Sequence, residues 1–172
     1  MKLKSALFGA AVLALATPAV AATGPTDPQI AHIAYTAGNL DIAAAKQALA
    51  RSHNKTVRSF AQEMIRDHQA VNVKALALVK KLHVTPEANP TSTGLTKQAD
   101  ATRARLGHLK GAAFDRAYLV SEVTYHKTVN GALESTLIPS AKNGELKSLL
   151  QTGLTLFREH QKHAEHLAKG MK

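Results

Sequence analysis

Histidines and carboxylates at helical spacing are the residues of this sequence best suited to chemistry. The chain contains nine histidines in 172 residues. His68 and His160 each lie within an apolar pattern that repeats every three or four residues. Glu122 and His126 are four residues apart, which places them on one face of a helix. Imidazole nitrogens and carboxylate oxygens together suit zinc, copper, iron or manganese.

Asp41 occupies a similar position among alanines. A charged group that is buried alone costs several kcal/mol, so these groups must pair with one another or with a cation. We expect one transition metal ion (zinc, copper, iron or manganese), with Glu122 as a further ligand or as a hydrogen-bond acceptor for one. The expected ligands are Asp41, His68, His126 and His160. The alternative is a hydrogen-bonded network of histidines and carboxylates without metal.

Nearby polar residues are weaker candidates. His163 is either a second ligand beside His160 or a solvated neighbour. Glu63 and Asp67 are four residues apart on the flank of the helix that carries His68. We expect these two carboxylates to pair with surface cations such as Arg66 rather than to bind metal.

Helices must position these residues. The sequence predicts helices over residues 28–51, 55–82, 95–109, 112–137 and 145–168, and it contains no alternating run typical of a strand. Pro28 follows a capping residue and begins the first helix. Segments rich in Pro, Gly, Asn and Ser separate the others. We therefore predict an all-α fold, a four-helix bundle with a short extra helix in the long connection between its second and third helices. The direction of the third helix relative to the second stays open.

The candidate residues lie at similar heights in such a bundle. A helix rises by about 1.5 Å per residue, so Asp41 and His68 differ by only about 5 Å when counted from their shared turn. His68 and His126 each lie near the middle of their helices. The groups are therefore expected to converge at one depth of the core.

Composition limits the remaining possibilities. The absence of cysteine excludes disulfides, thiolate nucleophiles and iron–sulfur clusters. Residues 1–21 have a basic start, an apolar run and a small-residue cleavage site, which predicts a secretory signal peptide. Its removal leaves a single domain over residues 22–172 and lowers the net charge from +10 to +8, because Lys2 and Lys4 are lost.

We therefore expect a periplasmic or secreted protein. Nucleic acid is not an expected partner in that location, whereas anionic components of the cell envelope are possible electrostatic partners. No later segment is long and apolar enough to suggest a transmembrane helix in the mature chain.

Three segments resemble a known family: VRSFAQEMIRDHQAVN (residues 57–72), GAAFDRAYLVSEVTYHKTV (residues 111–129) and LFREHQKHAEHL (residues 156–167). They are similar to domain of unknown function 4142, a family of secreted bacterial proteins with a ferritin-like four-helix bundle and no established activity. The resemblance covers about residues 29–167. It implies an acidic residue at Asp41, where the family usually has Glu, and histidines at His68, His126 and His160. Residues 152–157 lack the Leu-Pro usual before the last histidine.

Three functions are compatible with these features. The first is metal binding in the bundle core, for metal handling or tolerance of envelope stress. The second is a non-catalytic structural or interaction protein of the envelope, with a metal-free core network. The third is a metalloenzyme acting on peroxide or superoxide, and whether the protein is an enzyme stays open. A di-iron site is not expected, because the Glu-x-x-His motif of ferritin-like di-iron proteins is absent from the sequence.

Overall fold

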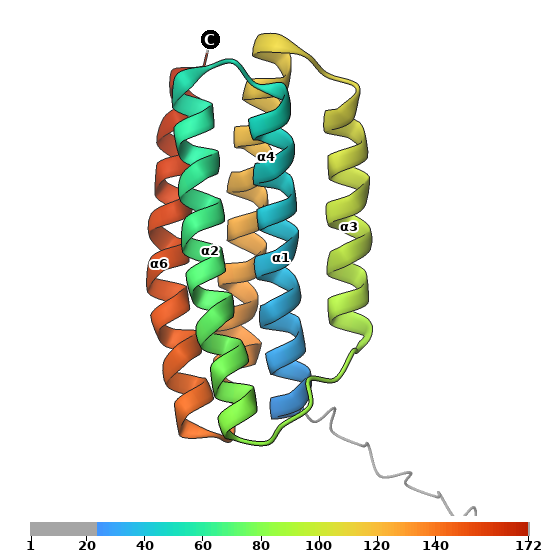
Figure 1. Cartoon of the computed structure of the whole chain (residues 1–172), viewed down its shortest axis with the longest axis vertical. Coiled ribbons are helices and arrows are strands. Elements are labelled where there is room, and N and C mark those ends of the chain that lie inside the picture. The colour runs from blue at the N-terminus through green and yellow to red at the C-terminus, as the bar shows by residue number, and fades with distance from the viewer. Residues whose placement is uncertain (1–23, 172) are drawn as a thin grey trace, which may run out of the picture.

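A computed structural model describes residues 24–171, and within this range the chain is helical without strands (Figure 1). The elements are α1 (Asp27–Arg51), α2 (Lys55–Lys81), α3 (Pro90–Gly107), α4 (Gly111–Ala132), the π-helix η1 (Leu133–Leu137), α5 (Ile138–Ser140) and α6 (Gly144–Gly170). The predicted all-α fold is confirmed. The predicted signal peptide, residues 1–21, lies outside the described residues.

Helices α1, α2, α4 and α6 form the bundle, and α3 packs along its outside against α1 and α4 (Figure 1). The chain runs along α1, returns along α2, and is carried back to the other end of the bundle by α3. Helix α4 therefore runs parallel to α2, and α6 runs parallel to α1. This connectivity, with one long crossover, is that of ferritin-like bundles and settles the direction that the sequence left open.

Asparagine and aspartate side chains fix the ends of the bundle helices. The Asn54 side chain accepts from the backbone N–H groups of Thr56 and Val57 at 2.9 and 3.3 Å, which begins α2. Asn143 caps α6 in the same way. The Asp27 carboxylate accepts the backbone N–H of Asn143 at 2.8 Å, so the start of α1 is tied to the turn before α6.

Helix α3 begins earlier than predicted. The sequence predicts a start at residue 95, whereas the helix starts at Pro90. The Asn89 side chain accepts the backbone N–H of Ser92 at 3.1 Å, and the Ser92 hydroxyl accepts the backbone N–H of Asn89 at 3.2 Å. Proline suits the first helical position, because the N–H it lacks has no partner there. The same residues that suggest a loop therefore begin a helix.

The helix predicted over residues 112–137 contains an irregularity that its sequence pattern did not reveal. Regular helix ends at Ala132 and is followed by the π-helix η1. The Ile138 N–H donates to the carbonyl of Leu133, five residues back. Pro139 lacks an N–H and its ring crowds the preceding turn of a regular helix, which accounts for a wider turn at this position.

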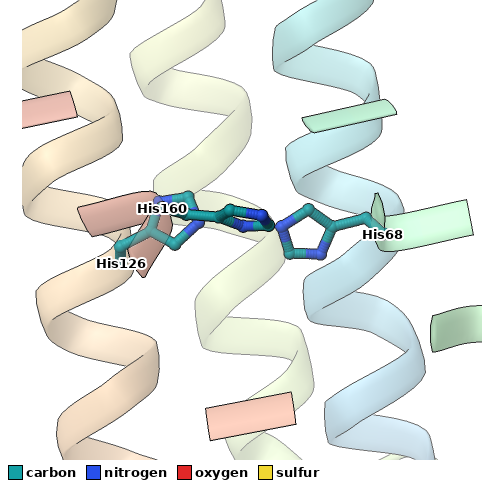
Figure 2. A group of neighbouring side chains, drawn as sticks. All are labelled: His68, His126 and His160. Carbon is teal, nitrogen blue, oxygen red and sulfur yellow. The ribbon is translucent and has the colours of Figure 1, made fainter. Parts of the chain in front are cut away.

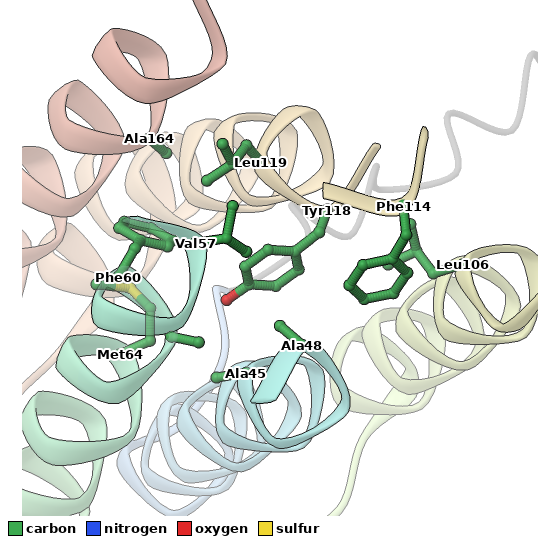
Figure 3. Packing of buried hydrophobic residues seen from close by; sticks show 11 residues of the cluster. Ala45, Ala48, Val57, Phe60, Met64, Leu106, Phe114, Tyr118, Leu119 and Ala164 are labelled. Carbon is green, nitrogen blue, oxygen red and sulfur yellow. The ribbon is translucent and has the colours of Figure 1, made fainter. Parts of the chain in front are cut away.

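Two apolar clusters fill the bundle. The aromatic cluster lies at the end of the bundle where α2 begins (Figure 3) and comprises Ala45, Ala48, Val57, Phe60, Ala61, Met64, Leu106, Phe114, Tyr118, Leu119 and Ala164. The aliphatic cluster lies at the opposite end and comprises Ile30, Ile33, Leu133, Leu137, Ala141, Leu146, Leu150 and Leu154. No helix within residues 24–171 is apolar over the length that a bilayer requires.

Candidate metal centre

A layer of buried polar side chains separates the two apolar clusters. It consists of Asp41, His68, Glu122, His126 and His160, which we call the polar layer, and each member is at most 3% exposed. α1 contributes Asp41, α2 contributes His68, α4 contributes Glu122 and His126, and α6 contributes His160. The structure thus brings together all five residues that the sequence singled out.

The three histidines converge from three helices (Figure 2). Their ring centroids are 5.4 to 5.8 Å apart, and one ring nitrogen of each lies within 4.8 Å of those of the other two. Zinc–nitrogen bonds are about 2.0–2.1 Å long, so small side-chain rotations would let all three nitrogens reach one ion. The geometry therefore fits a single ion between α2, α4 and α6.

Hydrogen bonds orient two of these rings. Nδ1 of His126 lies 3.0 Å from the Glu122 carbonyl oxygen. A carbonyl only accepts, so Nδ1 carries the proton and Nε2 keeps its lone pair. Nε2 of His160 lies 3.1 Å from the Asp67 carboxylate, which accepts its proton, so Nδ1 is the free nitrogen of this ring. Both free nitrogens lack a hydrogen-bond partner among residues 24–171.

The carboxylates lie on the α1 and α4 side of the polar layer. Oδ2 of Asp41 lies 3.5 Å from Nε2 of His68 and 3.6 Å from Nε2 of His126. Oε2 of Glu122 lies 3.7 Å from Nδ1 of His126. Both oxygens of Asp41 and Oε2 of Glu122 lack a hydrogen-bond partner in the described part of the chain. The two carboxyl groups therefore lie close to each other and to His126.

Burial controls protonation in the polar layer. Burial lowers the pKa of His68 to about 3, helped by the charge of His160, and lowers the pKa of His126 to about 4. These histidines are thus neutral near pH 7, which is the form that binds metal. Burial raises the pKa of Asp41 and, together with the neighbouring Asp41 charge, raises the pKa of Glu122 well above its usual range. A cation between the histidines and the carboxyl groups would favour the ionised form of Asp41 and Glu122.

Two cavities border the polar layer. On the aliphatic side, Phe157 stacks on the His68 ring at 4.7 Å and lines a cavity of about 270 Å³ whose walls are almost entirely apolar. On the carboxylate side, a cavity of about 330 Å³ lies between α1, α3 and α4 and is lined by Asp41, Glu122 and Tyr125. The second cavity offers a small molecule a place next to the carboxylates.

Sequence reasoning missed the role of Asp67. It pairs with Arg66 as predicted, at 2.7 Å, but it also accepts from His160 across the α2–α6 contact. The Arg66 guanidinium, with a smaller contribution from His160, holds the pKa of Asp67 below its usual range. The signal was present in the Asp-His pair of α2, yet the contact depends on how α2 and α6 face each other. His163 does not join the three-histidine group and instead pairs with Glu63.

Comparisons with known proteins agree with this fold. The crystal structure of a DUF305 protein from Streptomyces coelicolor, assigned as secreted, has a TM-score of 0.68 to this chain at 12% identity. The similarity covers 81% of this chain and 89% of the other. No curated protein matches the chain. The family described as a domain of unknown function, DUF4142, matches residues 12–167. Because this match covers most of the chain, the protein belongs to the DUF4142 family.

Proposed function

We propose that the protein binds one transition metal ion in its polar layer. His68, His126 and His160 supply nitrogen ligands, Asp41 supplies an oxygen ligand, and Glu122 is a further ligand or a hydrogen-bond acceptor for one. One observation carries the proposal: three histidines and the Asp41 carboxylate meet in a buried layer, and each has a ring nitrogen or an oxygen without a hydrogen-bond partner among residues 24–171.

The energetics of burial support a cation rather than a metal-free network. A buried polar group without a partner costs about 1–3 kcal/mol, and a charged one costs more. A self-sufficient network would join each of its donors to an acceptor. In the polar layer, both nitrogens of His68 and both oxygens of Asp41 lack such bonds within residues 24–171. A metal ion would bind one nitrogen of His68 and an oxygen of Asp41, whereas the N–H on the other His68 nitrogen would need a separate acceptor.

The ligand set restricts the type of metal. Imidazoles with one or two carboxylates suit zinc, copper, iron or manganese, and no cysteine is present to select a softer ion. One carboxylate balances half of the charge of a divalent cation and two balance all of it, which lowers the cost of burying the complex. The set is too poor in carboxylates for a ferritin-type di-iron centre. We therefore propose a mononuclear site.

We place this function in the cell envelope. The predicted signal peptide, residues 1–21, directs the chain out of the cytoplasm. In the envelope, its role would be metal handling or tolerance of envelope stress. The mature chain carries a net charge of +8. This charge favours contact with anionic envelope components at low salt.

Metal content tests the proposal. The protein is exported to the periplasm without an affinity tag and analysed by mass spectrometry beside His68→Ala/His160→Ala. We expect about one metal ion per wild-type chain and none in the double variant. The matched control is His53→Ala/His108→Ala, which removes two exposed histidines outside the polar layer and should keep the metal. Circular dichroism verifies that each variant folds.

The same experiment can refute the proposal. If the wild type contains no metal, even after incubation with zinc, copper, iron and manganese, the polar layer is a metal-free network. The second function, a structural or interaction protein, then applies. It predicts salt-sensitive binding to anionic envelope fractions and no change in stability with chelator.

Turnover is a second candidate function, favoured by the cavity that reaches Asp41 and Glu122. A metal-loaded protein that acts as an enzyme should consume peroxide or superoxide at a rate that His68→Ala abolishes. Equal rates for wild type and His68→Ala would exclude these two substrates and leave metal handling.

A further inference from the structure

A second cluster of potential metal ligands lies between α2 and α6, outside the polar layer. Glu63 and Asp67 are four residues apart on α2, and His160 and His163 are three residues apart on α6. Nδ1 of His163 lies 2.9 Å from Oε2 of Glu63, and Nε2 of His160 lies 3.1 Å from Oδ2 of Asp67. Ligand atoms of Glu63, Asp67 and His160 lie within 4.8 Å of one another. We call Glu63, Asp67 and His163 the outer cluster.

Exposure decreases steadily from the outer cluster to the polar layer. The side chain of His163 is 42% exposed, that of Glu63 is 28% exposed and that of Asp67 is 16% exposed. The side chain of His160 is 1% exposed. These four residues therefore form a continuous series of imidazole and carboxylate side chains that begins in solvent and ends in the core.

His160 contacts both the outer cluster and the polar layer. Its Nε2 contacts Asp67 of the outer cluster, whereas its Nδ1 is buried without a partner in the described chain and its ring lies 5.4 Å from that of His68. The His160 imidazole thus lies between the partly exposed carboxylates of the outer cluster and the other buried histidines. An ion bound by Glu63 and Asp67 would be separated from the polar layer by the His160 side chain alone.

We propose that the outer cluster is a second, weaker cation site through which a transition metal ion enters and leaves the polar layer. This inference rests on the proposed metal binding of the polar layer. Carboxylate oxygens and an exposed imidazole exchange an ion with water readily, whereas buried neutral histidines hold it. Transfer exchanges a metal–oxygen bond to Asp67 for metal–nitrogen bonds in the polar layer and requires no oxidant or reductant.

Arg66 competes with a metal ion for the Asp67 carboxylate of the outer cluster. Its guanidinium donates to both oxygens of Asp67, at 2.7 and 3.0 Å, while 70% of the side chain is exposed. Such an exposed pair contributes little stability and can open easily. An arriving cation therefore displaces Arg66 from Asp67, and removal of Arg66 should make entry faster.

The rate of metal loading tests the proposal. Full-length mature protein is stripped of metal and mixed with Co²⁺, and the visible absorbance of the bound ion is followed in a stopped-flow instrument. We expect Glu63→Gln/His163→Gln to load at least tenfold more slowly than wild type and still to reach one tightly held ion. We expect Arg66→Gln to load faster than wild type. The matched control is Glu159→Gln/His166→Gln, two exposed residues of α6, which should load at the wild-type rate.

A second measurement isolates the outer cluster. His68→Ala/His126→Ala should still bind one Co²⁺ weakly, and the further changes Glu63→Gln/His163→Gln should abolish that binding. Wild-type loading rates in both Glu63→Gln/His163→Gln and Arg66→Gln would overturn the entry route while the polar-layer site stands. The ion would then enter through the cavity between α1, α3 and α4. Absence of any Co²⁺ binding by wild type would overturn both proposals.

Discussion

In the aromatic cluster, Phe60, Phe114 and Tyr118 pack ring against ring, with centroids 6.2 and 6.3 Å apart. In the adjacent polar layer, imidazoles and carboxylates are just as deeply buried, but they face one another at distances longer than good hydrogen bonds. Burial stabilises the first region and destabilises the second. The apolar clusters therefore support the fold, whereas the polar layer costs stability.

The largest effect on stability should come from the aromatic cluster. Phe60 is fully buried and contacts both Tyr118 and the His163 ring edge. Phe60→Ala should lower the free energy of unfolding by about 3–5 kcal/mol, because it removes apolar contacts and leaves a cavity. Urea unfolding of the metal-free protein measures this loss. Metal content should be unchanged under conditions in which the variant is folded, and loss of metal from a folded variant would show that the two regions are not independent.

The opposite result is expected in the polar layer. Glu122→Met replaces a buried carboxyl with an apolar side chain of similar length, which should raise the stability of the metal-free protein by about 1–3 kcal/mol. Metal should bind more weakly, because an oxygen ligand or acceptor is lost. Urea unfolding with chelator measures the first effect, and Co²⁺ titration measures the second. Glu122→Gln is the control, since it removes the ionisable group but keeps a buried polar side chain, and it should therefore gain less stability than Glu122→Met.

The pH dependence of Glu122→Met follows from the raised pKa of Glu122. The folded state keeps this proton to a higher pH than the unfolded state does, so wild-type stability falls as pH rises above the usual value of 4.5. The advantage of Glu122→Met should therefore be largest near neutral pH and shrink as pH falls towards 4.5. A gain that grows at low pH would contradict the assignment of Glu122 as the destabilising group.

The sequence predicted the bundle helices well because their signals are local. Pro28, Asn54 and Asn143 mark the starts of α1, α2 and α6. The apolar residues that repeat every three or four positions identify the buried face of each helix. Helix α3 was harder to delimit, because Ser92 and Leu106 are its only buried residues and its face carries little periodic signal. The direction of α4 depended on how far α3 carries the chain, which no short pattern encodes.

The candidate site shows the same division. The position of each residue along its helix predicted that Asp41, His68, His126 and His160 share one depth of the core, because the rise per residue is constant. The contact of Asp67 with His160 could not be derived in this way. It depends on the rotation of α2 against α6, and a residue on the flank of a helix faces either solvent or its neighbour according to that angle. Metal binding itself stays a prediction until metal content is measured.

The smallest expected effect lies at the boundary between the two regions, at Tyr118. Its ring belongs to the aromatic cluster, but its hydroxyl lacks a hydrogen-bond partner among residues 24–171, and burial together with the nearby Glu122 and Asp41 raises its pKa well above the usual range. Tyr118→Phe keeps the ring and removes the hydroxyl. It should raise the stability of the metal-free protein by up to about 1 kcal/mol and leave metal content unchanged.

Tyr125→Phe is the matched comparison, because the Tyr125 hydroxyl donates to the Ala37 carbonyl at 2.8 Å. Removing this bond should lower stability by about 0.5–1.5 kcal/mol. Opposite signs for the two Tyr→Phe variants would place Tyr118 wholly in the aromatic cluster. A loss of both stability and metal in Tyr118→Phe would instead assign its hydroxyl to the polar layer, as a donor to Asp41 or Glu122. The boundary of the site would then extend one helical turn along α4, and the aromatic cluster would contribute to metal binding as well as to the fold.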